Sequence, residues 1–177
     1  MILWRSFQNN GVTYDLSHLN PVCFKFEQPA KGDKPSQTYR INAEFGLHCF
    51  TNDFKGTVFN SAESYSHSKE TRMFNYDRYN LSKRLPEIIA GLANRKCYHP
   101  GKGNFFTVEV TTEGTGTREY EVYFAISLSS TKGVLNLSVQ SAYVRDSKHR
   151  SNRPKSISFF VILFNTLNGH PIKPSPQ

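Results

Sequence analysis

The sequence predicts an α+β fold in which an antiparallel β-sheet packs against one kinked or broken helix. Three observations lead to this fold class. Apolar residues recur at every second position in several stretches, a pattern typical of half-buried strands. Residues 77–95 instead carry apolar residues at helical spacing. Aromatic residues make up 14% of the chain, and their rings favour the pleated surface of a sheet.

The length of the chain, 177 residues, is enough to bury a core without disulfides or metal. We therefore expect a single domain over residues 1–177. Its core covers about residues 12–168, and the proline-rich residues 169–177 form a loosely held tail.

The first predicted element is a β-hairpin. VCFKFEQ (22–28) alternates apolar and polar residues, and PAKGDKPS (29–36) supplies the Pro, Gly and Asp of a turn. The alternation resumes in TYRINAEFGLHCF (38–50). The following residues, 51–76, are polar and weakly patterned, which indicates a surface loop or a short helix.

Residues 77–95 give the clearest helical pattern in the chain. The apolar residues that form one helical face are Leu81, Leu85, Ile88, Ile89 and Leu92. Pro86 interrupts this pattern, because a proline inside a helix costs about 3 kcal/mol. We expect a kink near Arg84, or a second helix that has Pro86 in its first turn.

The rest of the chain is predicted to be a four-stranded antiparallel meander joined by short turns. Its expected strands are residues 105–112, 118–130, 134–144 and 157–168. The sheet offers the predicted helix a surface on which to bury its apolar face.

The net charge of +8 indicates a polyanionic partner, since Lys and Arg displace the counterions of nucleic acid. An acidic protein surface would also fit, as would a basic protein with no such partner. The longest apolar run, residues 159–164, has only the length of a strand, so we expect no membrane contact. The three cysteines show no CxxC pair, and free thiols favour the cytoplasm.

Two basic clusters are candidates for binding nucleic acid, one in residues 95–102 and one in 145–155. The residues expected to bind nucleic acid are Arg95, Lys96, Tyr98, Lys148, Arg150 and Arg153. Tyr98, Tyr143 and the pair Phe105 and Phe106 could stack on bases. The alternative interpretation is that a helix end attracts cations and that wet loops carry charge.

Several other chemistries are disfavoured. GKGN (101–104) lacks the Walker pattern, and no GxSxG motif for a serine nucleophile occurs. Three local His and Cys pairs could form a zinc site only by converging, yet His48 and Cys49 are adjacent on a strand and point to opposite faces. We therefore expect neither a metal nor a cofactor.

One chemistry suits a basic, aromatic site without metal, namely cleavage of RNA through its own 2′-hydroxyl. It needs a base for that hydroxyl, an acid for the leaving 5′-oxygen and cations for the phosphate. The candidate catalytic residues are His48, His99, Lys102, Tyr143 and Arg145. They form one site only if the end of the helix meets the last strands.

Several motifs resemble a family of small bacterial proteins labelled as stationary-phase growth adaptation or heat-shock-type proteins. They are YDLSHLNP (14–21), FGLHCFT (45–51), RYNLSKRLPEIIAGLANRKCYHPGKGNFFTVEV (78–110), VLNLSVQSAYVRD (134–146) and FFVILFNTLNGHPIKP (159–174). A weaker likeness runs from VLNLSVQSAYVRD to the RelE-like and BrnT-like ribonuclease toxins. That resemblance implies roles for Tyr143 and Arg145.

Two functions therefore stay open. The protein either binds or cleaves RNA in bacterial growth control, stress response or defence, or it is a non-enzymatic module that binds a protein such as an antitoxin. The second function would use an exposed sheet edge and an aromatic patch. The sequence leaves the oligomeric state open.

Overall fold

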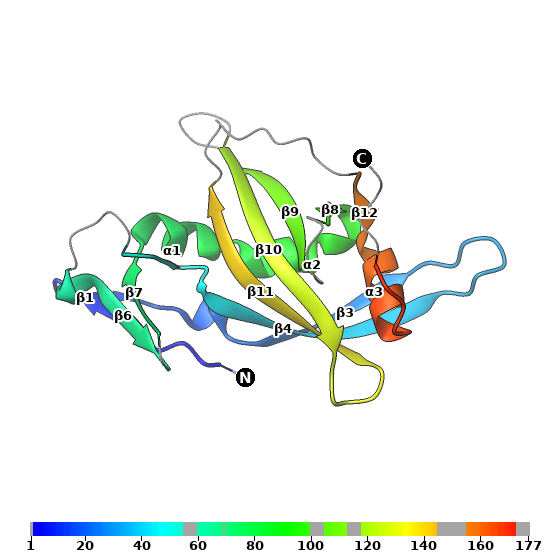
Figure 1. Cartoon of the computed structure of the whole chain (residues 1–177), viewed down its shortest axis with the longest axis horizontal. Helices are drawn as coiled ribbons and strands as arrows, with labels where there is room; N and C mark the ends of the chain where they lie inside the picture. Colours follow the sequence, from blue (N-terminus) through cyan, green and yellow to red (C-terminus); the bar gives the residue numbers. More distant parts are fainter. Residues whose placement is uncertain are drawn as a thin grey trace.

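The computed structural model describes residues 2–54, 60–68, 70–99, 105–112, 118–144 and 155–172. They form an α+β structure, which confirms the predicted fold class. A seven-stranded sheet runs through the molecule (Figure 1), in the order β12–β8–β9–β10–β11–β4–β3. Its strands are β3 (Val22–Gln28), β4 (Gln37–His48), β8 (Lys96–Tyr98), β9 (Phe105–Thr112), β10 (Arg118–Leu128), β11 (Val134–Val144) and β12 (Ile157–Ser158).

The predicted hairpin and the predicted meander join into this one sheet through a parallel pair of strands. Strands β3 and β4 pair antiparallel, and so do β9, β10 and β11. Strand β11 then lies parallel to β4, with Leu135 opposite Ile41. A parallel pair needs a long connection, and residues 49–133 provide it.

The predicted break in the helix is confirmed. The first helix, α1 (Tyr76–Ser82), ends before the second, α2 (Leu85–Ala90), in whose first turn Pro86 lies. There the missing N–H of proline leaves no helical hydrogen bond unmade. Short 3₁₀ helices are η1 (Ser17–Leu19), η2 (Ser61–Glu63) and η3 (Leu92–Asn94). None of the helices that the structure describes is long and apolar enough to cross a membrane.

The fourth predicted strand of the meander is wrong. Only Ile157–Ser158 is a strand, and Phe159–Leu167 forms the helix α3. A short continuous apolar run has no period that separates a strand from a helix. Here Phe159, Ile162 and Leu163 are buried at helical spacing, and the ring of Phe159 meets those of Phe26 and Phe124 in the core.

The prediction of a loop or short helix over residues 51–76 is also wrong. Apart from η2, the described part of this segment forms a second, three-stranded sheet of β5 (Thr51–Asn52), β7 (Glu70–Phe74) and β6 (Ser64–His67). Its aromatic residues pack with those of the first residues of the chain, including the hairpin of β1 (Phe7–Asn9) and β2 (Val12–Tyr14). Because β5 follows β4 after a two-residue turn, this small sheet stands at the end of β4 (Figure 1).

All three α-helices pack on one face of the large sheet. In Figure 1, α1 and α2 cross behind β10 and β11. Their buried residues belong to one apolar core with those of the sheet and α3, including Ile41, Phe45, Val122, Phe124 and Leu137. The polar residues of the strands therefore belong to the opposite face.

Candidate functional site

The face of the sheet opposite the helices carries a group of polar and aromatic side chains. It lies where β10 begins and where β11 and β4 end. We call this group the polar face, and it consists of Glu121, Tyr123, Ser141, Tyr143 and His48. Alternation along the strands explains it, because the neighbouring Val122 and Ala142 point into the core.

Strand register brings these residues together from distant parts of the sequence. Across β10 and β11, Glu121 lies opposite Tyr143. Across β11 and β4, Ser141 lies opposite His48. Tyr143 and His48, two of the predicted catalytic residues, therefore lie on adjacent strands and on the same face.

Two hydrogen bonds link three side chains of the polar face in a row. The hydroxyl of Tyr143 donates to that of Tyr123 at 2.9 Å, and the hydroxyl of Tyr123 donates to Oε2 of Glu121 at 2.8 Å. The two rings are stacked, with centroids 5.5 Å apart and planes 19° apart. Burial raises the pKa of Tyr123, and its hydrogen bonds to Tyr143 and Glu121 add to this rise, so the phenol stays protonated.

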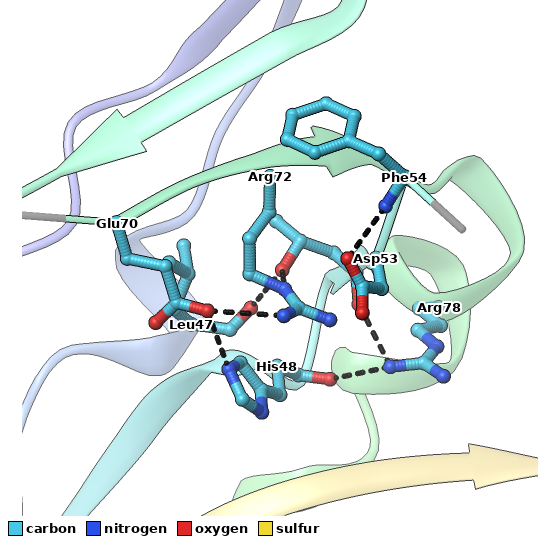
Figure 2. Close-up of polar contacts among 8 residues, drawn as sticks. Leu47, His48, Asp53, Phe54, Glu70, Arg72 and Arg78 are labelled. Carbon is cyan, nitrogen blue, oxygen red and sulfur yellow. Dashed lines mark hydrogen bonds and ion pairs between the residues drawn. The ribbon is translucent and has the colours of Figure 1, made fainter. Parts of the chain in front are cut away.

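Arg78 supplies a cation to the polar face. Its Cζ lies 5.4 Å from the ring centroid of Tyr143, a cation–π contact. Its Nη1 donates to the backbone oxygens of His48 at 3.0 Å and Thr51 at 2.7 Å (Figure 2). The side chain of Asn75 caps α1 by accepting from the backbone N–H of Arg78 at 2.8 Å, which fixes Arg78 in the first helical turn.

The charge of Arg78 is not neutralised by a carboxylate of the described residues, since its hydrogen-bond acceptors there are backbone carbonyls. Burial lowers the pKa of Arg78, and the nearby charge of Arg72 lowers it further. A guanidinium nevertheless keeps its proton at neutral pH. A partly desolvated cation of this kind attracts an anionic ligand strongly.

His48 is the first residue of a polar network that connects β4 to the small sheet (Figure 2). Its Nε2 lies 3.0 Å from Oε1 of Glu70, and Nη1 of Arg72 donates to the same oxygen at 3.0 Å. Arg72 also donates through Nε to Oγ1 of Thr51 at 3.0 Å. Burial opposes ionisation of Glu70, but the hydrogen bonds from His48 and Arg72 outweigh it and lower the pKa of Glu70.

This network suits His48 to proton transfer. Its side chain is 41% exposed, so a ligand can reach the imidazole. The carboxylate of Glu70 orients the ring through its contact with Nε2. His48 can therefore serve as a general acid beside the cation of Arg78.

The structure does not bring together His48 and His99, two of the candidate catalytic residues. His99 is only 5% exposed, and its ring contacts that of Phe106, which belongs to the core. It follows β8, so β9, β10 and β11 lie between it and β4. The two histidines are therefore on opposite faces of the sheet.

The first basic cluster, Arg95, Lys96 and Tyr98, lies in or beside β8, two strands from β10, and part of it shares the side of the sheet that carries the polar face. Lys96 and Tyr98 flank the buried Cys97, so alternation turns them to that side. Tyr98 lies opposite Thr107 of β9, which lies opposite Tyr123 of β10. Base stacking on Phe106 is excluded, because its side chain is fully buried. The other predicted site residues, Lys102, Arg145, Lys148, Arg150 and Arg153, lie outside the described residues.

Most partners of the polar face were not predicted from the sequence. Glu121 and Tyr123 alternate in the stretch REYEVYF, inside an expected strand, and alternation alone does not select them as site residues. Glu121 is 5% exposed. Arg78 and Arg72 had no local pattern that could have selected them, since only the folded chain brings them to β4 and β11.

The His and Cys pairs considered for zinc do not converge. Cys49 and Cys97 are buried, and burial raises the pKa of each thiol to about 12. Nε2 of His18 instead lies 2.8 Å from Oγ of the buried Ser82. Across the described ranges, no group of three or more His, Cys, Asp or Glu side chains is placed to hold a metal ion.

One hollow of about 400 Å³ lies beside the start of α1. It is lined by Asn52, Glu63, Met73, Phe74, Asn75, Tyr76 and Asp77. Two carboxylates in this lining make it a poor site for an anion. Arg78 and the polar face offer an anionic ligand a more favourable electrostatic environment.

Comparison with known proteins identifies the family. A family model described as the YjaZ family matches residues 6–167. The chain is 33% identical to Protein YjaZ of Escherichia coli (strain K12) over 178 residues, which cover 98% of this chain and 96% of that protein. No solved structure matches it.

These matches correct the resemblances drawn from the sequence. The matched family is neither a stationary-phase or heat-shock-type family nor a RelE-like or BrnT-like toxin family, so both assignments are wrong. Because the family model and the relative each cover most of the chain, the chain belongs to the YjaZ family.

Proposed function

We propose that the protein binds RNA at the polar face and cleaves it without a metal, through attack of the 2′-hydroxyl on the adjacent phosphate. The observation that carries this proposal is the position of Arg78. Its guanidinium lies over the ring of Tyr143 and donates to the backbone oxygen of His48, and both of these residues belong to the polar face. A phosphate beside Arg78 would therefore have a candidate base and a candidate acid within one site.

Each of the three residues has a role in this reaction. Arg78 stabilises the negative charge that builds on the phosphate in the transition state. The hydroxyl of Tyr143 accepts the proton that leaves the 2′-hydroxyl of the RNA. His48, oriented by Glu70, gives a proton to the leaving 5′-oxygen.

The charge of the whole chain supports binding of a polyanion. The net charge is +8, and the basic segment 145–155 follows β11 directly in the sequence, beginning two residues after Tyr143. Cations so close in sequence to the polar face would increase the local concentration of RNA. A protein that acts on cellular RNA would work in the cytoplasm, and its three free cysteines suit that compartment.

The test is incubation of the purified protein with bacterial RNA, with and without EDTA, read on a gel. We expect discrete cleavage products in both lanes. His48→Gln should lose this activity, whereas His170→Gln, at an exposed histidine near the end of the chain, should retain it. Intact RNA with the wild-type protein would overturn the proposal.

Binding of a protein partner is the second candidate function. It is favoured by strand β3, which is one edge of the seven-stranded sheet and offers backbone groups for strand addition. Lys25 and Glu27 lie exposed on this strand, and charges on an edge oppose strand addition. We therefore rank this function second. Expression in bacteria separates the two, since growth arrest favours RNA cleavage and unimpaired growth favours the binding module.

A further inference from the structure

We infer that the hydrogen-bonded row Tyr143–Tyr123–Glu121 is a proton relay that removes the proton from the 2′-hydroxyl of the RNA, with the buried carboxylate of Glu121 as the final acceptor. This inference rests on the RNA cleavage proposed above. It assigns the general base to Glu121, which is 5% exposed to solvent and is connected to Tyr143 by hydrogen bonds through Tyr123.

The two hydrogen bonds run in one direction. Tyr143 donates its proton to Tyr123, and Tyr123 donates its proton to Glu121. Because the hydroxyl proton of Tyr143 is used in the bond to Tyr123, only the lone pairs of its oxygen can face a substrate. That oxygen therefore accepts a hydrogen bond from the substrate. A 2′-hydroxyl that donates to Tyr143 would extend the row by one member, at the end farthest from Glu121.

A tyrosine in this row can act as a base only if another group accepts its own proton. A neutral phenol can take up a proton only when it releases its own. Glu121 supplies the group that receives the released proton, at 2.8 Å from Tyr123. Glu121 is 5% exposed and ends the row of hydrogen bonds, so its carboxylate is placed to take the proton that Tyr123 releases.

The transfers balance as follows. The proton of the 2′-hydroxyl passes to Tyr143, the proton of Tyr143 to Tyr123, and the proton of Tyr123 to Glu121. The 2′-oxygen forms a bond to phosphorus as the bond from phosphorus to the 5′-oxygen breaks, which gives a 2′,3′-cyclic phosphate. The departing 5′-oxygen takes a proton from His48. Exchange with water then returns Glu121 and His48 to their starting states.

Arg78 assists the relay as well as the phosphate. While protons move, negative charge passes through the hydroxyl of Tyr143. The guanidinium lies 5.4 Å from the ring of that residue, where it lowers the energy of this charge. Tyr143 is the member of the relay that touches the substrate, and Tyr123 and Glu121 are positioning residues that act through it.

The test compares cleavage, binding and stability of single variants. Tyr123→Phe keeps the ring stacked on Tyr143 but removes the hydroxyl, and Glu121→Gln keeps the shape but removes the basic carboxylate. Tyr14→Phe is the matched control, since Tyr14 lies in the aromatic cluster near the start of the chain. Binding is measured with an oligonucleotide that has hydrogen in place of the nucleophilic 2′-hydroxyl, which binds but cannot react.

We expect Tyr123→Phe and Glu121→Gln to lower the single-turnover cleavage rate about 100-fold or more. Their Kd for the unreactive oligonucleotide and their Tm should stay close to the wild-type values, and Tyr14→Phe should cleave normally. A structural role would move Kd or Tm together with the rate. If Glu121→Gln fails to fold, Tyr123→Phe decides the question, since it leaves the carboxylate in place.

The possible failures are distinguishable. Wild-type cleavage together with normal cleavage by Tyr123→Phe overturns the relay and leaves the RNA-cleaving function intact. A Tyr123→Phe variant that loses binding and stability in parallel with its rate also overturns the relay. Wild-type protein that does not cleave RNA overturns both the relay and the proposed function.

Discussion

Arg78 lies over the ring of Tyr143, with its Cζ 5.4 Å from the ring centroid, although helix α1 and strand β11 are far apart in the sequence. The same guanidinium donates hydrogen bonds to the backbone oxygens of His48 and Thr51, on either side of the turn that follows β4. One side chain thus joins a helix, a parallel strand pair and the start of the small sheet. This contact is the centre of the candidate site.

Replacing Arg78 should affect both stability and RNA binding. Arg78→Lys keeps a charge, but an ammonium cannot reproduce the planar guanidinium, which lies over the ring of Tyr143 while its Nη1 donates to the carbonyls of His48 and Thr51. We expect the free energy of unfolding to fall by about 2 kcal/mol. Urea denaturation measures this loss.

The salt dependence of RNA binding separates the effect of Arg78 on binding from its effect on stability. If the guanidinium contacts a phosphate, Arg78→Gln should bind RNA more weakly and with a salt slope reduced by about 1. Lys132→Gln, at an exposed cation in the turn between β10 and β11, is the matched control. An unchanged slope for Arg78→Gln would show that Arg78 has only a structural role.

The acid role of His48 can be tested with a modified RNA. We expect His48→Gln to lower cleavage of ordinary RNA by about 100-fold to 10,000-fold. A linkage with sulfur in place of the bridging 5′-oxygen needs no acid, because a thiolate leaves without a proton. His48→Gln should cleave this linkage at a rate near that of the wild type, whereas Tyr143→Phe should stay slow. Equal defects of His48→Gln on both substrates would rule out the acid role.

The ion pairs of Glu70 should give a pH-dependent stability. Hydrogen bonds from His48 and Arg72 lower its pKa in the folded state, so the stabilisation is present above the unfolded value of about 4.5 and is lost as pH falls through the folded value. The wild type should therefore exceed Glu70→Gln in stability at pH 7 but not at pH 3. Because Glu70 is half exposed, the difference should be below about 1 kcal/mol. A difference unchanged between the two pH values would contradict this account.

Alanine substitutions can verify that residues 159–167 form a helix. Ile162 is fully buried, so Ile162→Ala should cost about 2–5 kcal/mol of unfolding free energy. Val161 is 46% exposed, and Val161→Ala should change stability by less than about 0.5 kcal/mol. A strand would bury Val161 on the same side as Phe159 and would reverse this order. Thermal or urea unfolding of the two variants distinguishes the two structures.

Local patterns predicted the elements that have a clear period or a strong breaker. Residues 22–28 and 134–144 are strands with the predicted bounds, and Pro86 begins a second helix as expected. Side-chain alternation and the missing N–H of proline act within a few residues, so they can be read without knowledge of the fold. The apolar run after Ser158 has no such period, and its helix forms because the core accepts Phe159 and Ile162.

The sequence by itself determined the α+β class, the alternating strands and the broken helix, and it suggested Tyr143 and His48 among the candidate site residues. Only the tertiary structure decided that β11 lies parallel to β4, which brings those two residues to one face. It also decided that His99 is buried on the other face and that Glu121 stands behind two tyrosines. The physical reason is that alternation fixes which face a side chain takes but not which strand lies beside it. That choice comes from long-range packing of the whole core.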